Sequence, residues 1–88
     1  MQEFEISNVA LFDLDGVAFS ALFSGKIYKF LISREALEDL QGAISLDGSG
    51  LLSAFENRRA LIIRVAQKFT DPSYEHFDRI ILRTENFR

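Results

Sequence analysis

The sequence contains no cysteine and a single histidine among its 88 residues. Without cysteine the chain can form neither a disulfide nor a thiolate metal site. The one histidine, His76, leaves too few nitrogen ligands for a transition-metal centre and is expected in a solvated loop. We therefore expect no metal and no cofactor, and a fold stabilised by packing or by association between copies.

Basic residues are also scarce, with ten Lys and Arg against 13 Asp and Glu and a net charge of -3. This balance disfavours a nucleic-acid partner and an anionic membrane surface. The most apolar stretch, Val9–Phe23, is interrupted by Asp13, Asp15 and Gly16, so it cannot span a membrane. The acidic first residues do not form a signal peptide. The sequence predicts one cytoplasmic domain over residues 1–88.

Aromatic residues are plentiful, with nine Phe and two Tyr, and several of them lie in a predicted β-hairpin. Val17–Phe23 and Lys26–Ile32 flank Ser24-Gly25, which suits a two-residue turn. On one face this turn pairs Phe23 with Lys26, Ala21 with Tyr28, Phe19 with Phe30 and Val17 with Ile32. The opposite face carries Leu22, Ile27, Ser20, Lys29, Ala18 and Leu31. The aromatic face is expected to form the core.

Strand signals also occur at both ends of the chain. Phe4 and Ile6 alternate with polar residues and predict a short strand, which Asn8 ends with a turn. Val9–Leu14 is apolar enough to form a second short strand. Near the C-terminus, Arg79–Glu85 predicts another strand whose successive side chains point to opposite faces.

Two helices are predicted between the hairpin and the last strand. Ser33 is a suitable N-cap for a helix over Arg34–Gln41, which Gly42 ends. A longer helix is predicted over Leu51–Phe69, capped by Asp47 or Ser49. The resulting order is β-(β)-β-β-α-α-β. This order predicts an α+β fold in which a mostly antiparallel sheet, the N-terminal β-hairpin plus the C-terminal strand, packs on two helices.

One short segment suggests catalysis. Asp13-Leu14-Asp15-Gly16 after an apolar run resembles the first motif of the haloacid dehalogenase superfamily. That resemblance implies a Mg²⁺-dependent phosphohydrolase in which Asp13 attacks a phosphoryl group and Asp15 acts as acid and base. The other interpretation is a turn, because the chain continues into a hairpin instead of the loop and helix of that superfamily. We take the chain as non-enzymatic and keep the phosphohydrolase as the alternative.

The helix predicted over Leu51–Phe69 has an apolar arc of roughly 200°, about twice what covering a sheet requires. The surplus must be buried on the other helix or on a second subunit. Arg59 lies within this arc and Arg58 at its edge. The Arg59 side chain either extends along apolar surface to water or forms a partly buried ion pair with Glu35, Asp39 or an acid of a partner chain.

These features predict a protein-interaction or regulatory module that acts as a homodimer or binds another protein. A chain of this size is too small to bury both the helix arc and the second face of the hairpin. The candidate interface or ion-pair residues are Arg58, Arg59, Leu61, Val65, Leu22, Ile27 and Leu31.

Sequence segments in a fixed order resemble a family of small bacterial proteins, domain-of-unknown-function family 1488. The resemblance covers nearly the whole chain and implies a compact α+β fold with no established activity. It transfers no catalytic residue. The segments that carry it are Asp15-Gly16-Val17-Ala18-Phe19, Ile27–Ile32, Glu35-Ala36-Leu37, Ala54-Phe55 with Arg59, Ile62 and Ala66, and Ile80–Phe87.

Overall fold

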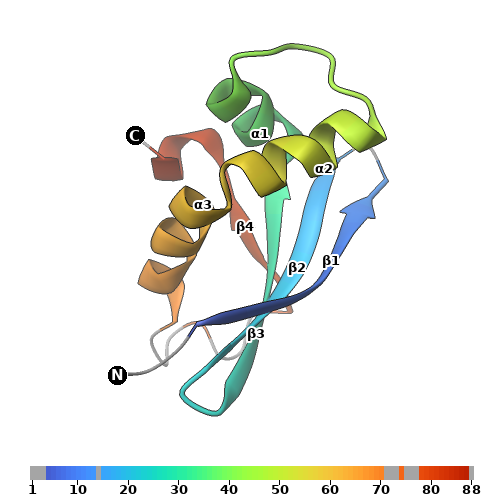
Figure 1. Ribbon diagram of the computed structural model, residues 1–88. Helices are drawn as coiled ribbons and strands as arrows, with labels where there is room; N and C mark the ends of the chain where they lie inside the picture. The colour runs from blue at the N-terminus through green and yellow to red at the C-terminus, as the bar shows by residue number, and fades with distance from the viewer. Residues whose placement is uncertain (1–3, 14, 71–73, 75–77, 88) are drawn as a thin grey trace.

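The fold is α+β, as the sequence predicted, and is seen in a computed structural model that describes residues 4–13, 15–70, 74 and 78–87 (Figure 1). The predicted loop residue His76 lies outside these residues. In chain order the elements are β1 (Glu5–Phe12), β2 (Gly16–Phe23), β3 (Lys26–Ser33), α1 (Arg34–Gln41), α2 (Gly48–Asn57), α3 (Arg59–Ala66), the 3-10 helix η1 (Gln67–Phe69), β4 (Ile80–Leu82) and the 3-10 helix η3 (Thr84–Phe87).

The four strands form one sheet in the order β1-β2-β3-β4. The β1–β2 and β2–β3 pairs are antiparallel, and β4 runs parallel to β3. The helices lie between β3 and β4 in sequence and gather on one side of the twisted sheet (Figure 1). The predicted hairpin register is confirmed, with Phe19 opposite Phe30 and Phe23 opposite Lys26. One sheet face is therefore covered by helices, and we call the opposite one the open face.

The core joins the covered sheet face to the helices through stacked and tilted aromatic rings. The Phe19 and Phe30 rings stack with centroids 5.2 Å apart, and the Phe55 ring of α2 lies 5.2 Å from Phe19. Tyr28 is buried, and its hydroxyl donates a 2.9 Å hydrogen bond to the Thr70 carbonyl, which fastens the end of η1 to the sheet. The aromatic face of the hairpin thus supplies the core, as expected from its alternation.

The predicted turn at Asn8 is wrong, because β1 passes through it as one strand. Ser7 pairs with Ser20 and Ala10 with Ala18, so three steps along β1 match two along β2. One extra residue in β1 makes this a β-bulge. Asn8 has φ of 55°, a conformation that Asn tolerates better than most residues. A bulge changes the local twist without ending the strand, so the two predicted short strands are one.

The single helix predicted over Leu51–Phe69 is divided into α2, α3 and η1 and begins earlier, at Gly48. The division falls at Arg58, where φ is -114° and ψ is 17°. Each α-helix turns its own apolar residues inward, Phe55 in α2 and Ile62 in α3, and both are fully buried. A straight helix could not direct so wide an apolar arc at one core, and the change of direction allows it.

The predicted strand Arg79–Glu85 is shorter in the structure, where β4 covers only Ile80–Leu82. Asn86 stops the strand, because its Oδ1 accepts a 2.7 Å hydrogen bond from the Arg83 N–H and its own N–H donates to the Arg83 carbonyl at 2.9 Å. These local bonds turn the chain into η3. Ile80 and Leu82, which the alternation places on the same face, are both buried, whereas Ile81 between them is exposed.

The N-cap of α2 makes the stability of the fold depend on pH. Asp47 Oδ1 accepts hydrogen bonds from the Gly50 N–H at 2.7 Å and the Ser49 hydroxyl at 3.1 Å. These two hydrogen bonds, of which the one from Gly50 has the larger effect, hold the pKa of Asp47 below its ordinary value of 3.8. A group whose pKa is lowered on folding stabilises the protein above its unfolded pKa, and this contribution is lost as pH falls through the folded pKa.

We therefore expect Asp47→Ala to lower the urea midpoint at neutral pH, because the cap is lost. The difference from the parent should narrow as the pH falls below 3.8. Urea titrations followed by circular dichroism at neutral and acidic pH measure this. Asp39→Ala, which removes an exposed carboxylate from α1, is the control. A difference between Asp47→Ala and the parent that stays constant with pH would contradict the assignment.

Candidate functional site

The segment resembling a phosphatase motif forms the connection between β1 and β2, within which Leu14 lies outside the described residues. Asp13 and Asp15 are exposed, and the Asp15 backbone N–H donates to the Phe12 carbonyl at 3.0 Å. The Asp15 carbonyl accepts a 2.8 Å hydrogen bond from the Arg34 N–H at the start of α1. The two aspartates are thus carried by a turn between antiparallel strands, and the chain continues into β2 instead of the loop and helix of that superfamily.

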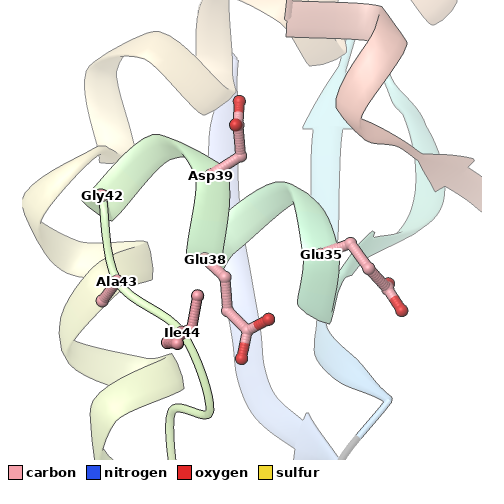
Figure 2. A pocket seen from close by; sticks show the side chains of 6 residues that line it. All are labelled: Glu35, Glu38, Asp39, Gly42, Ala43 and Ile44. Carbon is pink, nitrogen blue, oxygen red and sulfur yellow. The ribbon is translucent and has the colours of Figure 1, made fainter.

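A hollow of about 360 Å³ lies between α1 and the loop after it, lined by Glu35, Glu38, Asp39, Gly42, Ala43 and Ile44. Figure 2 shows that the three carboxyl groups point in different directions instead of converging on one point. Glu38 already has partners, because Oε2 lies 3.2 Å from Arg34 Nε and accepts a 3.0 Å hydrogen bond from the Leu46 N–H. Arg34 Nη2 also donates to the Leu46 carbonyl at 2.8 Å. Of the acids of this hollow, Glu38 therefore serves to fix the loop.

No group of three or more His, Asp or Glu residues suited to hold a metal ion occurs in the part of the chain that the structure describes. Among the same residues, no helix combines the length and the apolar character that crossing a membrane requires.

The candidate interface residues of the long helix lie at the break and in α3 after it, but they do not share one exposed surface. Arg58 is exposed at the break, and Arg59 Nη1 lies 3.0 Å from Glu56 Oε1, an acid in α2. Val65 is only 4% exposed and Leu61 packs against the core. The structure therefore pairs Arg59 with Glu56, which sequence reasoning did not consider, and gives Val65 a place inside the chain's own core.

The candidate residues of the sheet lie together on the open face. Leu22 and Ile27 are directly opposite each other in β2 and β3, with exposures of 42% and 70%. Leu31 lies on the same face between Ala18 and Ile81, its register partners, and is only 8% exposed. Ile81 and Phe12 add further exposed apolar surface, so the open face is mainly apolar at its two ends.

A second hollow, of about 210 Å³, is lined by Asn8, Ala18, Phe19, Ser20, Lys29, Phe30 and Arg79. Arg79 immediately precedes β4, and its Cζ lies 4.4 Å from the centre of the Phe12 ring in β1. The arginine therefore reaches from one edge strand of the sheet to the other. Its Nε is buried and has no hydrogen-bond partner.

Sequence reasoning missed Arg79 and Phe12 as members of a site. Alternation did place Arg79 on the face opposite Ile80, and Lys29 opposite Ser20 on the open face of the hairpin. What it could not supply was the pairing of β4 with β3, which brings Arg79 to the hollow. The sequence feature that could have indicated this site is Arg79 itself, a cation on the outward face of the predicted strand Arg79–Glu85, next to the apolar Ile80.

The fold and the open face define a small α+β module built on a mixed four-stranded sheet. The family model described as "Protein of unknown function (DUF1488)" matches residues 13–82. This chain belongs to the DUF1488 family. The resemblance noted from the sequence segments is thereby confirmed.

A solved structure shares this fold. It is the crystal structure of a protein of unknown function of the DUF1488 family from Shewanella loihica PV-4. The two chains are similar with a TM-score of 0.72 and 22% identity, over 93% of each chain. No curated protein matches the sequence.

Proposed function

We propose that this chain is a non-enzymatic protein-interaction or regulatory module that acts as a cytoplasmic homodimer through the open face of its sheet. The observation that supports it best is the exposure of Leu22, Ile27, Phe12 and Ile81 on the face opposite the helices. Exposed apolar groups gathered on one surface of a small protein are typical of interaction sites. The absence of cysteine suits a reducing compartment, which is consistent with the cytoplasm.

The charges of the open face favour a second copy as the occupant. Glu5 lies opposite Leu22 on this face, while Lys29 and Arg79 lie nearer its centre. A two-fold axis that lies between the two copies, parallel to the face, allows the acid of one copy to lie over the cations of the other, which is the self-complementarity that a two-fold dimer requires.

The size of the face sets the expected strength. Its eight-residue strands β1, β2 and β3 make it roughly 26 Å long, from about 3.3 Å per residue, and the spacing of about 4.8 Å between its four strands makes it about 14 Å wide. Its flat area, roughly 360 Å², is less than half of the about 800 Å² that a standard specific interface buries on each partner, so the contact is expected to be weak. We therefore expect a reversible dimer with a dissociation constant in the micromolar range.

Light scattering and sedimentation equilibrium test this directly. The parent should reach twice its monomer mass of 10.0 kDa as its concentration rises through the micromolar range. The double variant Leu22→Asp/Ile27→Asp should stay monomeric, because it would bury charge in an apolar contact.

The matched control is Ile44→Asp, which changes an isoleucine that is 87% exposed in the loop after α1. It should dimerise like the parent, and circular dichroism should show that all three proteins are folded. A parent that remains monomeric at every concentration would refute the homodimer.

A further inference from the structure

Two cations border one hollow in the middle of the open face. Lys29 extends from β3 and Arg79 from the residue before β4, and both line the space of about 210 Å³ together with Ser20 and Asn8. This volume equals about seven water molecules at roughly 30 Å³ each. The space is therefore large enough for a small polar group.

The guanidinium of Arg79 packs over an aromatic ring. Its Cζ lies 4.4 Å from the Phe12 ring centre, a cation–π contact that orients the planar group. Its Nε–H is buried without an acceptor. An unsatisfied buried donor on a charged group is costly, and native proteins contain few of them. A negative group at the hollow would lower this cost by compensating the charge.

Neither cation forms an ion pair within the described residues. The acids that neighbour them by strand register or in sequence are Glu5, on the same face opposite Leu22, Asp78, which precedes Arg79, and Asp13, which follows Phe12. By contrast, Arg34 and Arg59 form ion pairs with Glu38 and Glu56 on the helices. Two positive charges thus share one space without a carboxylate between them.

We propose that this hollow binds an oxyanion, the carboxylate or phosphate group of a ligand. The planar guanidinium of Arg79 offers parallel donors that match such a group, and Lys29 adds a positive point charge. Ser20 contributes a hydroxyl at the wall. The competing account is that Arg79 only covers apolar surface with its stem, as long cationic side chains do. The proposal does not depend on the homodimer.

The side-chain Nε–H resonance of Arg79 provides a direct test by nuclear magnetic resonance. We expect inorganic phosphate, and separately acetate, to shift this resonance in a saturable manner at constant ionic strength set with chloride.

Lys29→Met should weaken phosphate binding roughly tenfold, because one charge-assisted contact is lost. The control Lys68→Met removes an exposed lysine of η1 and should leave the affinity unchanged. A resonance that neither anion shifts in a sample diluted to monomer would support the covering role and overturn the proposal.

A dilution series without added anion tests whether a second copy of the chain supplies the oxyanion. If Glu5 of a second copy supplies the carboxylate, the Arg79 resonance should shift with protein concentration, and Glu5→Gln should abolish the shift. If a free anion is the ligand, phosphate should saturate the site in dilute monomer. No shift in either series refutes the proposal. Light scattering on the same samples reports association separately, so a missing dimer would not be mistaken for a missing anion site.

Discussion

Gly16→Ala is expected to destabilise the protein by about 3 kcal/mol or more. A Cβ at this position would overlap the Ile32 carbonyl oxygen and approach the Ile32 carbonyl carbon to 3.1 Å and the Ser33 Cα to 3.2 Å. These are backbone atoms of the neighbouring strand, so a side-chain rotation cannot relieve the contact. The backbone φ of 155° adds strain for any residue with a side chain.

The loss corresponds to a melting temperature lower by about 12 °C or more, since each kcal/mol is worth about 4–8 °C in a domain of this size. Differential scanning calorimetry measures it. Gly25→Ala is the matched control, because Gly25 also has positive φ, 75°, but nothing within 4 Å of the added Cβ. Equal losses in the two variants would contradict the close approach at Gly16 and leave only the backbone conformation as the cause.

Phe55→Ala is expected to cost about 3–5 kcal/mol, because the ring is fully buried and its removal leaves a cavity between α2 and the sheet. The Phe55 ring lies 5.2 Å from that of Phe19, which itself stacks on Phe30, so the cavity would loosen the centre of the core. Urea unfolding followed by circular dichroism gives the change in the free energy of unfolding.

Ile44→Ala serves as the control for this substitution. Ile44 is 87% exposed, and shortening it should change stability by less than about 0.5 kcal/mol. A loss below about 1.5 kcal/mol for Phe55→Ala would show that the core refills the space, and would contradict the packing described.

The hairpin could be predicted from sequence because its two determinants are local. A two-residue turn fixes which residues are opposite, and alternation fixes which face is apolar, so the pairing of Phe19 with Phe30 follows. The N-cap at Ser33 is equally local, since its hydroxyl accepts from the Ala36 N–H at 3.1 Å. Features that depend only on neighbours within a few residues could therefore be predicted from the sequence.

The remaining features depend on contacts between distant segments. Asn8 is a turn residue in isolation, but pairing with β2 makes it part of a bulge within β1. The break at Arg58 is set by the core that α2 and α3 share, not by a proline or glycine at that position. The hollow with Lys29 and Arg79 exists only because β4 joins β3, which no local pattern specifies.

The parallel pairing of β4 with β3 also determines the order in which the fold can form. The first three strands are neighbours in sequence and need only short loops to pair, whereas β4 must return after the whole helical segment. Closing a long loop costs more conformational entropy than closing a hairpin and is therefore slower. During synthesis, residues up to Ser33 can form a three-stranded sheet while its Phe-rich face still awaits the helices. We therefore expect the fourth strand, and with it Arg79, to join after the first three, so that the proposed anion site would be completed only late in folding.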